Sequence, residues 1–137
     1  MFQQILIESS KRVLDQLEYG HAELAYEKAL VCELTARGIR CESEITIPEY
    51  YIDSNNKKHY ITFLRIDISI LKDNNETETI VELKTVKSNL GKDKEYIQAL
   101  RYKRLAGAEN CYLINFGYKR LEVYDCCAEE FKNLCEN

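Results

Sequence analysis

Three residues near the middle of the chain combine carboxylate and ammonium groups at a spacing that could support chemistry. Asp67 lies in the run FLRIDISI, and Glu82 and Lys84 lie in the later run TIVELKTV. Because side chains alternate between the faces of a strand, Glu82 and Lys84 would share one face. If the two runs pair, Asp67 and Glu82 come close, and two such carboxylates repel unless a cation lies between them. Mg²⁺, with Mn²⁺ as a substitute, is the natural candidate because it prefers oxygen ligands and usually takes one or two protein carboxylates.

Lys84 would lie beside this metal, where its ammonium group could stabilise charge that builds on a phosphate. Later in the chain, Gln98, Arg101 and Tyr102 are spaced so that they share one face of a helix. An amide, a guanidinium and a phenol on one face suit contacts with a nucleic-acid backbone. The alternative is bland: Asp67 and Glu82 would be a solvated polar pair with Lys84 as a surface salt-bridge partner, which contributes little.

The elements that must position these residues follow from hydrophobic periodicity and turn composition. Turns rich in Asn, Asp and Lys at 53–58 and 73–76 separate three alternating runs, and a charged helical pattern follows them. The expected helices cover residues 2–18, 22–36, 93–106 and 128–134, and the expected strands cover 39–52, 59–72, 78–86, 110–116 and 119–124. Within the second strand, Ile66, Ile68 and Ile70 are expected on one buried face. The pattern predicts an α/β fold with a mixed central sheet and one right-handed helical crossover.

The bulk composition is typical of a single globular domain that spans residues 1–137. Hydrophobic residues make up 45% and charged residues 31% of the chain. The sequence contains no apolar run long enough to span a bilayer and does not begin with a signal-peptide pattern, which favours an intracellular protein without membrane association. The six cysteines form no C-x-x-C pair, so reduced thiols are expected rather than a zinc site.

The charge pattern allows, but does not require, a nucleic-acid partner. A net charge of −4 argues against strong nonspecific binding to phosphates. Lysines and arginines nevertheless concentrate in the second half of the chain, which is compatible with one basic face on an acidic body. The ten tyrosines leave open a protein partner or a homodimer, because exposed tyrosines suit interfaces.

Several motifs in order resemble one family of small proteins. The segment GHAELAY at 20–26 matches G-x-x-E-x-x-Y, and VELK at 81–84, QALRY at 98–102 and LINFG at 113–117 also match. The chain resembles the GxxExxY family of the PD-(D/E)XK nuclease-like superfamily over roughly residues 10–125. The resemblance implies a restriction-endonuclease-like αβββαβ core with a metal site at the sheet edge.

The resemblance also implies roles for particular residues. Asp67 and Glu82 correspond to metal ligands, Lys84 to the catalytic lysine, and Glu23 to a helical acid that supports the metal site. Gln98 and Tyr102 match the Q-x-x-x-Y element of RecB-type nucleases, which positions the substrate strand. The implied function is a Mg²⁺-dependent nuclease, with DNA favoured over RNA as substrate. The alternative, motivated by the acidic net charge and by a first helix without the family's histidine, is an inactive nuclease fold that binds nucleic acid or a protein partner, including a homodimer.

Overall fold

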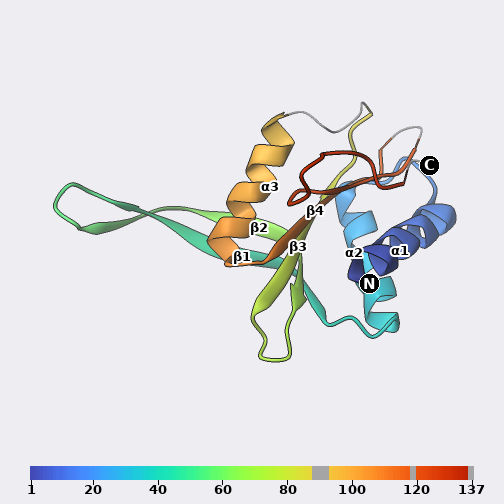
Figure 1. Ribbon diagram of the computed structural model, residues 1–137, viewed down its shortest axis with the longest axis horizontal. Coiled ribbons are helices and arrows are strands. Elements are labelled where there is room, and N and C mark those ends of the chain that lie inside the picture. Colours follow the sequence, from blue (N-terminus) through green and yellow to red (C-terminus); the bar gives the residue numbers. More distant parts are fainter. Residues whose placement is uncertain (88–92, 118–119, 136–137) are drawn as a thin grey trace.

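The computed structural model describes residues 1–87, 93–117 and 120–135, and it forms a five-stranded sheet with helices on both faces (Figure 1). Along the chain the elements are α1 (Phe2–Leu17), α2 (Glu23–Ala36), β1 (Cys41–Ile52), β2 (Lys58–Leu71), β3 (Thr77–Lys84), α3 (Asp93–Ala106), β4 (Asn110–Asn115) and β5 (Glu122–Asp125). The strands lie in the order β1-β2-β3-β4-β5. Only β3 and β4 are parallel among the strand pairs described, and α3 connects them. This confirms the predicted mixed α/β sheet.

The order of elements agrees with the sequence prediction up to the last strand, and no boundary differs by more than three residues. β5 begins at Glu122, three residues later than expected. Of the loop expected over 87–92, residues 88–92 lie outside the described residues, and so do Tyr118 of the expected turn and Lys119 of the last expected strand. Among the helices that the structure describes, none combines the length and the apolar character needed to cross a bilayer.

Two hydrophobic clusters divide the core between the faces of the sheet. The larger cluster joins α1 and α2 to the sheet through residues such as Tyr26 and Val81, and the smaller one joins α3 to the opposite face through Ala99 and its neighbours. The prediction that three isoleucines share one face is wrong for Ile66, which packs in the α3 cluster, whereas Ile68 and Ile70 pack with α1 and α2. The regular alternation breaks between Ile66 and Ile68, where β2 separates from β3 and Glu44 on the facing strand has φ 55°.

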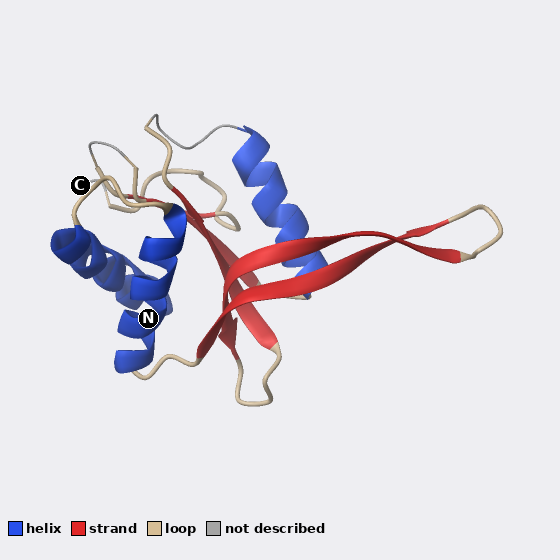
Figure 2. Cartoon of the chain, turned by 180° about the vertical axis from the view of Figure 1, so that it is seen from behind, coloured by secondary structure: helices blue, strands red, loops and turns tan. Residues whose placement is uncertain are grey.

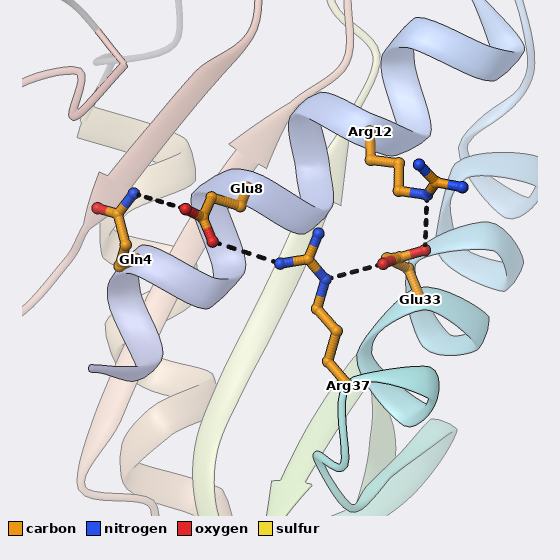
Figure 3. Close-up of polar contacts among 5 residues, drawn as sticks. All are labelled: Gln4, Glu8, Arg12, Glu33 and Arg37. Atoms are coloured by element: carbon orange, nitrogen blue, oxygen red, sulfur yellow. Dashed lines mark hydrogen bonds and ion pairs between the residues drawn. The ribbon is translucent and has the colours of Figure 1, made fainter.

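A chain of polar contacts holds α1 against α2 (Figure 3). Arg37 donates to Glu33 at 2.8 Å and reaches Glu8 at 3.3 Å, while Arg12 reaches Glu33 at 3.2 Å. Gln4 donates to Glu8 at 3.3 Å and extends the chain along α1. These pairs set the register of the two helices. Because they face the solvent, each pair adds little stability.

The predicted tail helix over 128–134 is wrong, because this segment forms turns and an extended stretch along β5. The Leu134 N–H donates to the Val123 carbonyl at 2.8 Å, and the Asn133 side chain accepts the Val123 N–H at 2.9 Å and donates to the Leu121 carbonyl at 3.2 Å. A helix would use its own backbone groups internally and could not satisfy the open edge of β5. Hydrogen bonding to the backbone groups of this strand edge outweighs the weak local preference of the segment for a helix.

The hairpin of β1 and β2 extends well beyond the body of the molecule (Figures 1 and 2). Its two strands pair from Cys41↔Ile70 at the base to Ile52↔Lys58 at the tip. The base lies within the sheet, whereas none of the described strands pairs with the tip as a third strand. A two-stranded ribbon alone is only marginally stable in water.

Candidate active site

The site forms where β2 and β3 separate. Their backbone pairing ends at Ile68↔Val81, one residue before Asp67 and Glu82 would face each other. Beyond that point the two carboxylates replace ladder bonds. Glu82 Oε2 accepts the Asp67 N–H at 2.9 Å, and Asp67 Oδ2 accepts the Leu83 N–H at 2.8 Å. The acids therefore converge through reciprocal bonds to the opposite strand.

Burial makes this pair electrostatically unfavourable without a cation. Glu82 is only 6% exposed, and burial and the negative charge of Asp67 raise the pKa of Glu82 well above its usual range. Within the described ranges neither acid makes an ion pair with Lys, Arg or His. Buried charges are normally paired or bind a metal. The surface salt-bridge alternative for Lys84 is not what the structure shows.

A polar cavity of about 90 Å³ opens onto this pair. The residues that line it come from α2, β2, β3, α3 and β4, and are Glu23, Arg65, Asp67, Glu82, Lys84, Glu95, Gln98, Ala99, Tyr102 and Leu113. The structure thus brings together six of the seven residues singled out from the sequence.

Two other residues place Glu23 at the cavity. Gly20 has φ 107°, a conformation that side chains disfavour, and this allows the sharp turn between α1 and α2. Tyr26 is fully buried, donates its hydroxyl to the Glu18 carbonyl at 2.6 Å and accepts the His21 N–H at 3.2 Å. Its ring stacks on Phe116 at 4.7 Å. The G-x-x-E-x-x-Y spacing therefore orients the first turn of α2.

The end of β3, which carries Lys84, is held by a buried amide. Asn115 lies opposite Lys84 in the sheet, and its side chain accepts N–H groups of Val86 at 3.0 Å and Gly117 at 2.9 Å. A Cβ atom on Gly117 would lie 1.8 Å from the Val86 carbonyl oxygen, so only glycine fits. The asparagine and the glycine of the LINFG segment thus hold the backbone that follows Lys84.

The α3 residues separate into two groups. Gln98 donates to the Tyr102 hydroxyl at 3.0 Å, and both line the cavity. Arg101 instead forms an ion pair with Glu49 on β1, outside the cavity lining. Arg101 therefore links α3 to the β1–β2 hairpin.

Three further charged residues belong to the site and escaped the sequence analysis. Glu27 is 4% exposed, and its pKa is raised to about 7 by burial and by the charge of Asp67. Arg65 and Glu95 line the cavity, and one oxygen of Glu95 is buried without a hydrogen-bond partner among the described residues. Glu27 follows Glu23 by one helical turn, a spacing that could have flagged it.

The donor set fits a hard divalent cation. Asp67 and Glu82 offer carboxylate oxygens that no cationic side chain of the described ranges pairs with. Mg²⁺ commonly binds one or two carboxylates and keeps several waters. No group of three or more His, Cys, Asp or Glu side chains suited to a metal ion occurs in the part of the chain that the structure describes. The two carboxylates that would hold the ion are those of Asp67 and Glu82. Glu23 lines the same cavity but does not form a three-ligand metal group with them in the described part of the chain.

Comparisons with known proteins identify the fold and the superfamily of the chain. One solved structure, titled "Crystal structure of SSO0001", shares the fold with a TM-score of 0.54 and 20% identity, covering 92% of this chain and 79% of that chain. A search of curated proteins found no match. A family model described as the PD-(D/E)XK nuclease superfamily matches residues 1–125. The chain therefore belongs to the PD-(D/E)XK nuclease superfamily.

Proposed function

We propose that this chain is a divalent-metal-dependent nuclease that hydrolyses phosphodiester bonds in DNA, with Mg²⁺ as its metal and Mn²⁺ as a substitute. One observation carries the proposal. Asp67 and Glu82 converge in a polar cavity, one of them almost fully buried, and neither forms an ion pair with any cationic side chain among the described residues. Lys84 lines the same cavity. Its six free cysteines suit a reducing compartment, so we place its action inside the cell.

Six of the residues that line the cavity have a defined task in this proposal. A bound divalent cation would polarise the scissile phosphate and lower the pKa of the attacking water. Asp67 and Glu82 hold the ion, and the Lys84 ammonium group stabilises the negative charge that develops on the phosphate. Gln98 and Tyr102, already bonded to each other, present an amide and a phenol to the nucleic-acid backbone. Glu23 adds a carboxylate at the exposed side of the cavity.

A cleavage assay tests the proposal directly. Wild-type protein would be incubated with single-stranded, nicked and duplex DNA, and with RNA, in Mg²⁺, Mn²⁺ or EDTA. We expect metal-dependent cleavage that Glu82→Ala and Lys84→Ala each reduce at least 100-fold, on the order of oxyanion-stabilising groups elsewhere. Lys72→Ala is the matched control, because Lys72 pairs with Glu109 away from the cavity. Cleavage that survives both cavity substitutions would refute the assignment.

A second candidate function is a nuclease fold that binds nucleic acid, or a protein partner such as a second copy, without turnover. The lack of a three-ligand metal group in the described residues favours it, as does the net charge of −4. Binding to oligonucleotides that is insensitive to EDTA, together with no cleavage of any substrate, would support this function over the nuclease.

A further inference from the structure

The β1–β2 hairpin beyond the body, residues 46–65 and here called the arm, exposes an unusual amount of apolar surface. Figure 2 shows it projecting past α3, and no other described helix or strand lies beside its tip. Six of its large hydrophobic side chains are exposed, namely Tyr50, Tyr51, Ile52, Tyr60, Ile61 and Phe63. Contiguous exposed apolar surface of this kind marks an interaction site.

A bulge gathers the aromatic side chains onto one face. Pro48 pairs with Phe63, but the register then shifts, so that Tyr50 pairs with Tyr60 and Ile61 is the extra residue. In a regular strand Tyr60 and Phe63 would point to opposite faces, and the extra residue restores them to the same one. Tyr60 and Phe63 line a common shallow groove, and the Tyr50 and Tyr60 rings meet edge to face at 6.1 Å. Pro48, Tyr50, Tyr60 and Phe63 are here called the aromatic strip.

The aromatic strip lies on the face of the arm that turns away from α3. Glu49, one residue along β1, points to the other face, where it pairs with Arg101 of α3. Ile47 on that same opposite face packs against the α3 cluster. None of the residues that the structure describes therefore covers the strip in the way that α3 covers the base of the other face.

Cationic side chains lie at both ends of the strip, and the nearby carboxylates already bind other groups of the protein. Lys58 at the tip end lies 4.1 Å from the centre of the Tyr50 ring. Arg65 at the inner end pairs with Glu44 and also lines the cavity with Asp67. Asp53 in the turn accepts N–H groups of its own loop and pairs with His59. Aromatic rings between cations suit stacked bases and their phosphates.

We infer that the aromatic strip binds a single-stranded segment of nucleic acid by base stacking and leads it past Arg65 into the cavity. This inference adds a substrate-binding surface to the proposed function. Only the description of the bound strand as a substrate rests on that function. Duplex DNA cannot stack its paired bases on side chains, so the strip selects single strands or unpaired ends. Arg65 belongs both to the arm and to the cavity lining, so it is the residue that would connect the strip to the site.

The test measures binding without cleavage. Fluorescence anisotropy of a labelled oligothymidylate of about 20 nucleotides would be recorded in EDTA for wild type, Tyr60→Ala, Phe63→Ala and Tyr51→Ala. Tyr51 is the matched control for Tyr60, because the two side chains are 60% and 59% exposed and lie on opposite faces of the same arm. We expect Tyr60→Ala and Phe63→Ala each to weaken binding about 5-fold to 100-fold, since stacking contributes ~1–3 kcal/mol per base. Tyr51→Ala should bind like wild type.

Each outcome has a defined meaning. Equal affinity of all four proteins, no binding by wild type, or tighter binding to a matched duplex would overturn the inference. Sedimentation that shows a dimer which Tyr60→Ala dissociates, with oligonucleotide affinity unchanged, would assign the strip to a second copy and overturn it too. Failure of the nuclease proposal is distinguishable, because it would show as stacking-dependent binding without cleavage in Mg²⁺ or Mn²⁺.

Discussion

Asp67 and Glu82 are joined by reciprocal hydrogen bonds, in which each carboxylate accepts an N–H from the strand that carries the other. This relationship orients both acids without neutralising them, because backbone N–H groups carry no net charge. Burial, followed by the negative charge of Asp67, holds the pKa of Glu82 well above its usual range. The pair is therefore organised in advance for a cation.

Mg²⁺ should stabilise the folded protein through Asp67 and Glu82. A ligand that binds only the folded state at 100 times its dissociation constant adds about 2.7 kcal/mol to the free energy of unfolding. We expect the melting temperature to rise by several degrees in saturating Mg²⁺ and the rise to disappear in Asp67→Asn. Glu76→Gln, at the exposed β2–β3 turn, is the control. An equal rise in Asp67→Asn would place the ion elsewhere.

Without metal, the free energy of unfolding should fall as the pH rises from about 4.5 to about 7. Burial and the charge of Asp67 raise the pKa of Glu27 from its ordinary 4.5 to about 7. Between these values the folded state holds the proton that the unfolded state releases, so stability is full below the unfolded pKa and is lost through the folded pKa. Each pKa unit corresponds to ~1.4 kcal/mol, so the effect is a few kcal/mol at most.

Glu27→Gln tests this pH dependence, because glutamine resembles the protonated acid at every pH. Urea unfolding in EDTA across this range should show a shallower slope for the variant than for wild type. Some slope should remain, since the pKa of Glu82 is also raised. An unchanged slope would mean that Glu27 does not hold its proton in the folded chain.

Tyr26→Phe should destabilise the protein and weaken the site together. It removes the hydroxyl that bonds the Glu18 carbonyl and the His21 N–H, which costs about 1 kcal/mol in chemical unfolding. The loop before α2 should loosen, and cleavage should fall because Glu23 is no longer oriented. Tyr19→Phe, at an exposed position of the same loop, should change neither quantity. Loss of stability with full cleavage would limit Tyr26 to a structural role.

Gly117→Ala should be more damaging than Gly38→Ala. A methyl group at position 117 collides with the Val86 carbonyl and displaces the end of β3, so we expect a loss above about 2 kcal/mol together with lower cleavage. Gly38 has φ 83° but open space around it, so alanine there costs only about 1 kcal/mol of backbone strain. Denaturant unfolding of both variants compares the two. Equal losses would show that β3 yields to the added methyl group.

The contents of the cavity show how far local patterns reach. Alternation within β3 placed Glu82 and Lys84 on one face, and helical spacing placed Gln98 beside Tyr102, because both relationships are properties of a single element. Arg101 lies three residues after Gln98, a spacing that also predicts a shared helix face. It nevertheless pairs with Glu49, which lies more than 50 positions earlier in the chain. No local periodicity reports which strand will pass beneath a helix.

The sequence by itself determined the α/β class, the order of the elements and the spacing of the acids and the lysine, since these depend on contacts between near neighbours in the chain. Only the tertiary structure decided that Glu27 and Arg65 join the site, that the segment over 128–134 covers an open strand edge, and that a bulge turns Tyr60 toward Phe63. Those outcomes depend on how the strands pair, separate and twist, and such long-range geometry is not written in the spacing of any one segment.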